Sequence, residues 1–466
     1  MEYVTGIILL LTFVGLAYYC IKGHNLMIGF LVMTTLWTIL PLASNALFAN
    51  GIIHNPDFIS ENPIILNSIL KDAEGKNGLL NTLNGIFQTA PENWGTTLVN
   101  VCWGAWFGRV LMETGVASTL IRKTVELGGD RPIVTIVLMN IVTAIIFISM
   151  AGPGPVIAIG VIALPILFSL GIPKSIALFS FTGSVASGVY LNPVNFAQFR
   201  VFFADASDKT ALFEYSEYTK VWGIWALVIS LVITCITTAF YMRVKKPIHA
   251  WAAQVEKPAD AGNVPTLALL TPILPVVGAI TLKLSVIFGF IIAGFLALFL
   301  CGKLKGGFQY ICKLVNKMFY DGVVDTAPLI GFLLTVPMFS KAAALCAPYF
   351  KAVVGNLIPQ STLLLCIIFV FLAGFGLFRG PMTLMGCGAA TLGVVKQMGF
   401  GLNFLYACFT IPTVTMNMGT CITQSWIAWG LAYSKVEGKN HLKLSIPNGY
   451  IISLALYVMT FFVLGR

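Results

Sequence analysis

The fold is decided by residues 149–199, which read SMAGPGPVIAIGVIALPILFSLGIPKSIALFSFTGSVASGVYLNPVNFAQF. The stretch is apolar throughout, yet it is interrupted at Gly152-Pro153-Gly154-Pro155 and again between Gly183 and Pro193. Backbone that loses its helical hydrogen bonds at membrane depth is tolerated only inside protein or beside a water-filled cavity. We therefore interpret this stretch as half of a buried solute site.

The composition indicates a protein that lives in a lipid bilayer. Of 466 residues, 58% are hydrophobic and 10% are charged, whereas soluble domains carry about 25% charged residues. Many apolar runs are long enough to cross a bilayer, so we expect an all-α polytopic protein of the cytoplasmic (inner) cell membrane. The formal charge of +10 lies in short loops that set topology, which excludes nucleic acid as a partner. The ten cysteines form no CxxC pair and are expected to be packing residues, with no metal or cofactor.

The apolar runs fall into two halves that follow the same plan. The first half, 1–242, is expected to contain spans 3–21 and 26–48, an extracytoplasmic segment 49–93, a span 95–112, a hairpin 132–170, a broken helix 175–204 and a span 221–242. The basic segment 243–263 is expected to be a cytoplasmic linker. The second half, 264–466, is expected to contain spans 264–282, 285–301 and 322–340, a hairpin 361–398, a broken helix 403–433 and a span 446–464. The loop charges place the N-terminus outside the cell.

Matched glycine and proline residues support a repeat. An offset of 228 residues (380 − 152) places Gly152 on Gly380 and Pro153 on Pro381, and these residue types punctuate backbone. Each half has five crossings plus one bent pair, and an odd number inserts the second half upside down. Two inverted repeats with broken helices at mid-membrane are typical of secondary transporters.

Two interpretations of each bent pair stay open. Residues 132–170 and 361–398 each form either two full spans or a re-entrant hairpin whose tip stops at mid-membrane. We favour the hairpin, because its arms are short and its Gly/Pro tip beside a broken helix would build one site from two interruptions.

Arg379 is the most informative charge, since it lies between two long apolar runs without an acidic neighbour in sequence. A guanidinium stays charged, and burying it without an anionic partner is costly. One interpretation is that Arg379 marks a cytoplasmic helix end. The one we favour places it at the second hairpin tip, where it forms bidentate hydrogen bonds with a substrate carboxylate.

The hairpin tips and broken helices carry the remaining candidate residues. Half-helix N-termini, hydroxyls and amides bind anions, and unwound carbonyls bind Na⁺; the alternative for each residue is helix packing. The expected substrate-binding residues are Gly152, Pro153, Gly154, Ser184, Ser187, Asn192, Asn195, Arg379, Gly380, Thr383, Thr413, Thr415, Asn417 and Thr420. The expected coupling-ion residues are Thr182, Thr410 and Asp325, although helix N-capping is the leading explanation for Asp325. The four histidines, His24, His54, His249 and His441, all fall in predicted loops.

These features predict a secondary active transporter for a small organic anion, coupled to H⁺ or Na⁺. The sequence contains no HExxH, GxSxG or Walker motif, so we do not expect an enzyme. The alternatives are a Na⁺/H⁺-type antiporter and, with less support, a membrane-embedded enzyme. Replacing Arg379 with Ala is expected to abolish uptake while the protein still inserts.

The segment 95–242 also resembles a known family. Asn93-Trp-Gly-Thr-Thr-Leu, the run GAWFGRVLMETGVA at 104–117, the apolar run ending in Leu164-Pro165 and the break before Pro193 are similar to the gluconate permease family and to the wider ion transporter superfamily of organic-anion symporters. The resemblance implies symport of a carboxylate or sugar acid. It also implies a homodimer in which a bundle carrying the hairpins moves, like an elevator, against a fixed scaffold.

Overall fold

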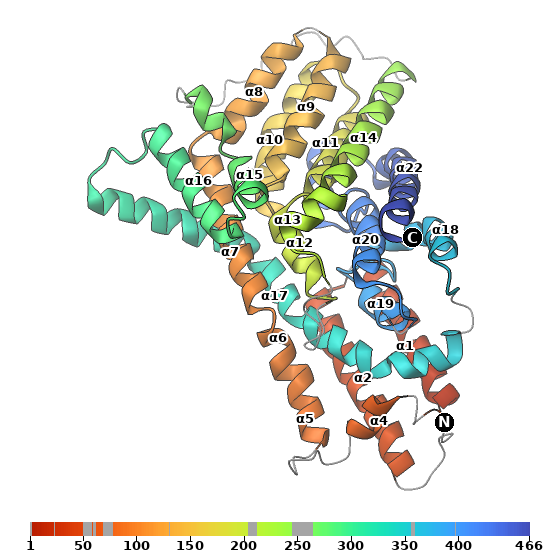
Figure 1. The fold of residues 1–466 in the computed structure, drawn as a ribbon. Coiled ribbons are helices and arrows are strands. Elements are labelled where there is room, and N and C mark those ends of the chain that lie inside the picture. The colour runs from red at the N-terminus through yellow and green to blue at the C-terminus, as the bar shows by residue number, and fades with distance from the viewer. Residues whose placement is uncertain are drawn as a thin grey trace.

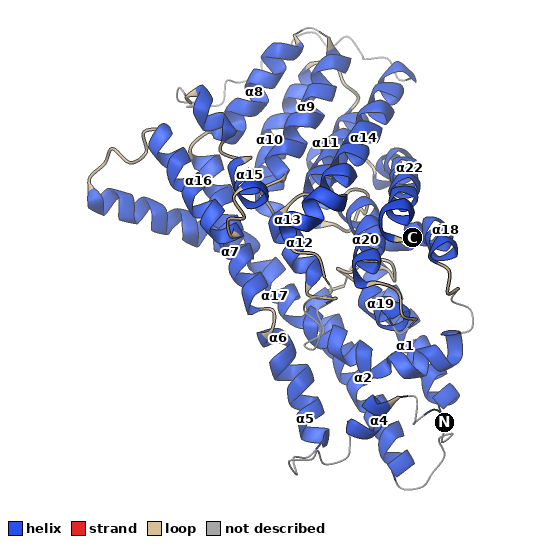
Figure 2. Ribbon diagram, in the orientation of Figure 1, coloured by secondary structure: helices blue, strands red, loops and turns tan. Residues whose placement is uncertain are grey.

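A computed structural model describes residues 2–22, 24–49, 58, 62–68, 78–129, 131–203, 212–244, 264–355, 359–396 and 398–466. Within these residues the secondary structure is helical and contains no strand (Figures 1 and 2). Six helices of the described residues are long and apolar enough to cross a membrane. The predicted all-α polytopic architecture is confirmed.

The first half contains helices close to those predicted. They are α1 (Glu2–Ile21), α2 (Leu26–Ala49), α4 (Pro63–Asn67), α5 (Gly78–Asn84), η1 (Gly85–Thr89), α6 (Ala90–Glu92), α7 (Gly95–Glu113), α8 (Val116–Gly128), α9 (Pro132–Phe147), α10 (Pro153–Ser169), α11 (Lys174–Val189), α12 (Pro193–Arg200), α13 (Tyr215–Tyr218), η3 (Thr219–Gly223) and α14 (Ile224–Val244). The arms α9 and α10 have 16 and 17 residues, or about 24–26 Å. Both lie just below the roughly 20 residues of a full span, so the two interpretations of this bent pair stay open.

The second half repeats the hairpin and the broken helix. Its elements are η4 (Thr266–Leu270), α15 (Leu274–Thr281), α16 (Val286–Leu300), α17 (Phe308–Val354), α18 (Thr362–Leu372), η6 (Ala373–Arg379), α19 (Gly388–Lys396), α20 (Leu402–Pro412), η7 (Thr413–Met418), α21 (Ser425–Ser434) and α22 (Gly438–Leu464). Most of the predicted linker 243–263 and much of 49–93 lie outside the described residues.

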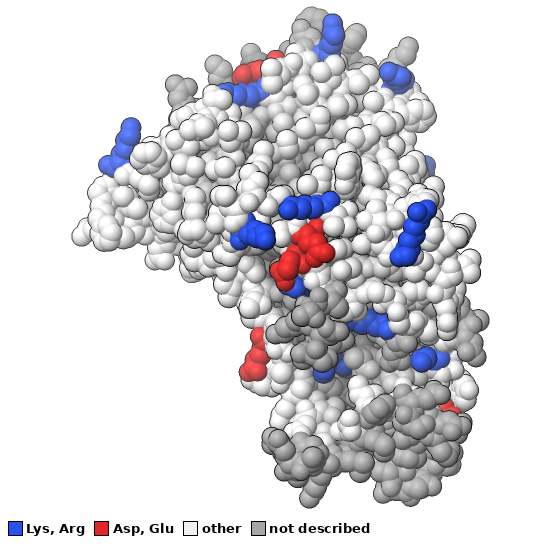
Figure 3. Space-filling view, in the orientation of Figure 1, with Lys and Arg blue, Asp and Glu red and all other residues white. Residues whose placement is uncertain are grey.

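The surface is that of a protein in lipid. Large apolar side chains are widely exposed, among them Leu11 at 67%, Ile236 at 62% and Phe371 at 74%. Charged side chains form isolated groups between broad uncharged areas (Figure 3). Exposed apolar surface on this scale is costly in water and favourable against hydrocarbon.

Helix α17 corrects the predicted span 322–340. It is one helix of 47 residues that crosses the width of the molecule (Figure 1), or about 70 Å. Gly322 does not begin it: a Cβ at this position would lie 2.9 Å from the Ala105 carbonyl, so the glycine permits close packing on α7. Lysines before Gly322 ended the apolar run in the sequence, but charge does not interrupt helical hydrogen bonding.

Three further boundaries differ from the predictions. The expected span 264–282 is two short pieces, η4 and α15, parted at Thr271-Pro272-Ile273, because Pro272 has no N–H to continue a helix. The first break is shorter than expected, because α11 stays helical from Gly183 through Val189. The last helix begins at Gly438, eight residues before the predicted span, so His441 lies in a helix and not in a loop.

Side-chain bonding follows the 228-residue offset. Ser187 of α11 donates to the carbonyl one turn back and bonds to Ser230 of α14 at 2.9 Å. Thr415 of η7, 228 residues later, also donates one turn back and bonds to Ser453 of α22 at 3.3 Å. The starts of α11 at Lys174 and α20 at Leu402 follow the same offset, whereas α19 begins at Gly388, seven residues after the position that matches the start of α10. The inverted repeat therefore stays a prediction.

Candidate functional site

The first hairpin tip rests on α17. Gly152, which precedes α10, has φ of +95°, a conformation that favours glycine, and Pro153 takes the first helical position. A Cβ on Gly152 would lie 3.3 Å from the Thr326 side chain, and one on Gly154 would lie 2.9 Å from that of Asp325. The tip glycines therefore let the backbone approach α17 closely.

Asp325 forms an ion pair beneath this tip. Its carboxylate lies 2.6 Å from the Arg109 guanidinium of α7, and the two side chains are only 25% and 31% exposed. Asp325 lies well inside α17, so the N-capping explanation is wrong. Asp325 was a predicted coupling-ion residue, and its carboxylate is already paired with the Arg109 guanidinium.

Asn192 ties the first break to the first hairpin. Its side-chain oxygen caps α12 by accepting from the N–H groups of Val194 and Asn195 at 2.9 and 3.2 Å. Its amide donates to the carbonyls of Phe147 and Met150, in the bend of the hairpin, at 3.1 and 3.0 Å. The amide is fully buried and bonded at both ends, so Asn192 acts as a brace between two interruptions.

Most candidate hydroxyls are bonded to backbone. Thr182, Ser184, Ser187, Thr413, Thr415 and Thr420 each donate to a carbonyl three to five residues earlier. This pattern fits the helix-packing alternative for these six residues. Asn195 is buried in α12.

The second bend has an unusual backbone. Phe378 and Arg379 both have left-handed φ, +55° and +59°, which is costly for residues other than glycine and concentrates at functional sites. The Phe378 N–H donates to the Cys421 sulfur at 3.0 Å, and the Arg379 carbonyl accepts from the Cys387 N–H at 3.0 Å. The first contact holds the strained tip against the second break, and the second closes the tip on itself.

Arg379 lies at this tip, as predicted, between α18–η6 and α19. Its two terminal nitrogens donate to the Met385 carbonyl at 3.1 Å and to the Gln424 side-chain oxygen at 2.6 Å. The guanidinium lies 5.7 Å from the centre of the Phe332 ring, and its buried Nε has no partner. Among the described residues no carboxylate pairs with Arg379.

Further unpartnered polar atoms lie on the same two segments. Thr383, after Gly380 in the tip, and Asn417, in η7, are fully buried. The Thr383 hydroxyl and both amide atoms of Asn417 have no hydrogen-bond partner. Tip and η7 are in contact, since the Leu384 N–H donates to Thr413 at 2.9 Å. Buried polar groups are rarely left unbonded, and a bound ligand or water is the usual reason.

The two broken helices and α17 bring both halves together. A Cβ on Gly419 would lie 2.9 Å from that of Ala186, and the Tyr190 hydroxyl donates to the Ile411 carbonyl at 3.4 Å. On α17, Asp325 and Phe332 are two turns apart on one side, about 10 Å. The first hairpin tip, which carries no charged residue, packs against Asp325, and the guanidinium of Arg379 lies over the ring of Phe332. The candidate site therefore has a neutral end and a cationic end.

Two of these residues were absent from the predicted site: Arg109 and Phe332. Arg109 could have been recognised, because an arginine within an apolar run is expensive unless it is paired. Phe332 had no signal, since an aromatic residue in an apolar helix is ordinary.

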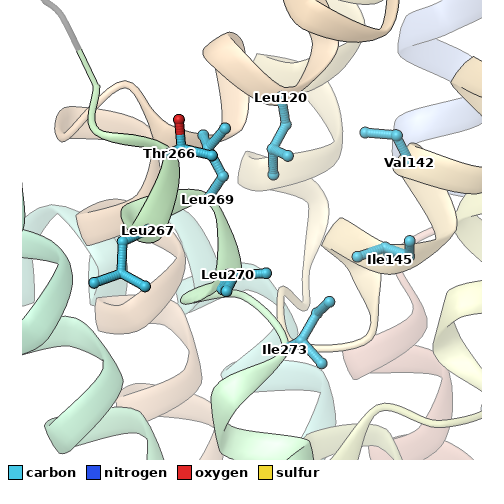
Figure 4. Close-up of a pocket in the computed structure, with 8 residues that line it drawn as sticks. All are labelled: Leu120, Val142, Ile145, Thr266, Leu267, Leu269, Leu270 and Ile273. Carbon is cyan, nitrogen blue, oxygen red and sulfur yellow. The ribbon is translucent and has the colours of Figure 1, made fainter.

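An apolar hollow lies outside the candidate site. It has a volume of about 370 Å³ and lies between α8, α9 and η4 (Figure 4). Thr266 is its one polar lining residue, beside Leu120, Val142, Ile145, Leu267, Leu269, Leu270 and Ile273. Such a lining is unsuited to a carboxylate.

Comparison with known proteins shows a likeness in fold. No family model and no curated protein matches the sequence. The structure is similar to the crystal structure of the Alcanivorax borkumensis YdaH transporter, described as having an unusual topology, with a TM-score of 0.60 over 95% of this chain and 100% of that chain. The sequences are 14% identical, so the likeness concerns the fold. The chain is a multi-pass membrane protein with the fold of a transporter.

Proposed function

We propose that this protein is a secondary active transporter that binds a small organic anion, such as a carboxylate or sugar acid, at Arg379. The observation that carries the proposal is the guanidinium at the second tip, held by a carbonyl and an amide but by no carboxylate of the described residues. A charge inside a membrane protein is stable when it meets an opposite charge. A substrate carboxylate supplies that charge.

The unbonded polar atoms of the second tip and of η7 fit an anion. The free Arg379 Nε and the Thr383 hydroxyl are donors, and Asn417 adds an amide N–H. Charge-assisted bonds from a guanidinium to a carboxylate are short and strong. The ordinary amide and carbonyl bonds that now hold Arg379 are weaker and exchangeable for a carboxylate.

Elevator-like motion of the hairpins against α1 and α17, within a homodimer, is the mechanism we propose. An apolar hollow of about 150 Å³ lies where α19 meets α1 and α17, lined by side chains such as Leu10, Phe13 and Val394. An apolar seam resists sliding less than a surface crossed by directional polar bonds. The proposed setting is the inner cell membrane, with the N-terminus outside and H⁺ or Na⁺ as the driving ion.

Reconstituted protein tests this function directly. Proteoliposomes are given labelled gluconate, succinate or lactate under an inward H⁺ gradient, an inward Na⁺ gradient or neither, with protein-free liposomes as the control. We expect accumulation of at least one carboxylate above its external concentration under one ion gradient only.

Two results would overturn the proposal. A Na⁺/H⁺-type antiporter, the alternative, would exchange the two ions with no carboxylate present and accumulate none. A membrane enzyme would convert an added compound without any gradient-dependent accumulation.

A further inference from the structure

His441 is a fully buried histidine without a hydrogen-bond partner. It lies in the first turn of α22, and neither ring nitrogen is bonded. Imidazole is the side chain that gains and loses a proton in the physiological pH range, and unbonded buried nitrogens are rare.

His441 lies on the face of α22 that packs against the second break. Gly438 and Ser445, at positions i−3 and i+4, share this face. A Cβ on Gly438 would lie 3.4 Å from Ile422, and the Ser445 carbonyl is within 3.5 Å of the Thr420 hydroxyl. His441 lies between these two residues in the sequence, on the face of α22 that contacts residues 420–422.

Arg379 lies on the other side of the same break. Gln424 bonds to its guanidinium, and the Cys421 sulfur accepts from the Phe378 N–H. The non-helical residues 420–424 thus contact both the tip that carries Arg379 and the helix face that carries His441. A negative charge bound at Arg379 would be felt by both, because the interior screens charge weakly.

The other charged groups nearby are directed to the surface. On the elements packed against this turn, the Tyr241 hydroxyl donates to the Leu444 carbonyl at 3.2 Å. The charged side chains of α11, α14, α22 and the turn before α22 are all exposed: Lys174, Arg243, Lys435, Glu437, Lys439 and Lys443. A proton added to His441 therefore has no buried carboxylate among these described elements to stabilise it.

We propose that His441 is the proton site of the transporter, and that it takes up H⁺ when a carboxylate binds at Arg379. This rests on the proposed function and specifies its coupling ion. The anion provides the counter-charge that the protonated imidazole lacks. By linkage the effect is reciprocal: the anion raises the affinity for the proton and the proton raises the affinity for the anion by the same factor. One H⁺ then moves with each anion, inward down the pH gradient.

Two measurements test the proposal, with His441→Gln as the variant and His24→Gln, an exposed histidine, as the matched control. The first follows the imidazole signals of isotope-labelled histidine in nanodiscs, with acetate as the probe and chloride as the salt control. We expect the signal that His441→Gln removes to be that of a neutral imidazole in the chloride control, because the buried ring has no partner. Acetate should raise its proton affinity by about fivefold or more. A signal whose proton affinity acetate leaves unchanged overturns the proposal.

The second measurement is gluconate transport. His441→Gln should lose accumulation driven by a pH gradient and retain gluconate exchange at equal pH, whereas His24→Gln should keep both. Accumulation by His441→Gln at the wild-type level overturns the proton site. Failure of the proposed function itself is recognised separately, because wild-type protein would then accumulate no carboxylate under any gradient.

Discussion

The first and second bends occupy matching positions in the two repeats, yet their polar groups are bonded very differently. In the first, Asn192 is bonded at both ends of its amide and ties the break to the hairpin. In the second, Asn417, Thr383 and the Arg379 Nε have no partner. Near the first hairpin tip the charge of Arg109 is paired with Asp325, although its Nε has no partner. At the second tip the guanidinium of Arg379, a hydroxyl and an amide all lack such a partner among the described residues.

The difference in bonding indicates that the two interrupted regions have different roles. Broken backbone in a membrane must be stabilised by protein or by water, and the first bend meets this need from its own side chains. The second keeps two left-handed residues and an uncompensated guanidinium. We infer that the first bend supports the site and the second binds the solute.

Replacing Arg379 should have the largest effect. Arg379→Gln removes the charge, and gluconate uptake should fall about a hundredfold or more, as when one partner of a buried charge pair is lost. Arg379→Lys should retain intermediate uptake, because an ammonium cannot bind a carboxylate bidentately. Lys283→Gln is the control, since Lys283 is an exposed cation that also has left-handed φ, +52°.

Uptake by Lys283→Gln should equal that of the wild type. Loss of uptake in the control to the same degree as in Arg379→Gln would mean that left-handed cationic positions matter for folding and not for binding.

Cross-linking the second tip should stop transport. Cys20 of α1 is a neighbour of Cys387, just before α19. Oxidation of purified protein should join the two sulfurs and fix the second hairpin to α1. Uptake should fall in proportion to the cross-linked fraction and recover with dithiothreitol, whereas Cys20→Ser should be insensitive to oxidant. Unchanged uptake by the cross-linked protein would contradict motion between α1 and the hairpin.

Asn417→Ala should have a smaller effect, on affinity alone. The substitution removes one unmet amide, so the protein should remain as stable as the wild type. The apparent affinity for gluconate should fall roughly tenfold, the size of one hydrogen bond to a charged group. Concentration-dependent uptake and thermal unfolding check the two statements, and a large drop in melting temperature would assign Asn417 to packing instead.

The sequence predicted those parts of the fold that depend on local composition. The spans 3–21 and 26–48 correspond to α1 and α2, because apolar length alone specifies a crossing. The predicted span 95–112 matches the bounds of α7. The tip at Gly152 and the bend at Arg379-Gly380-Pro381 followed from glycine and proline, which act on the backbone where they stand. Continuity of α17 could not be read this way, since Gly322 inside it is a contact surface for α7.

The roles of the site residues were harder to predict, because they depend on partners far along the chain. Asn192 and Asn417 look alike in sequence, but only the fold brings the Phe147 carbonyl to one of them and leaves the other unbonded. Asp325 had a local explanation as an N-cap until Arg109 was found beside it. A sequence specifies which groups are polar, and long-range packing decides which of them stay free.

Thermal unfolding with and without saturating gluconate tests the central claim most directly, because a ligand stabilises a protein only if it binds the folded state. Asn192→Ala should melt below the wild type yet keep the full rise in melting temperature with gluconate. Arg379→Gln should melt near the wild type and lose that rise. If Arg379→Gln keeps the gluconate-dependent rise, or Asn192→Ala alone loses it, the division between a supporting first bend and a binding second bend is wrong.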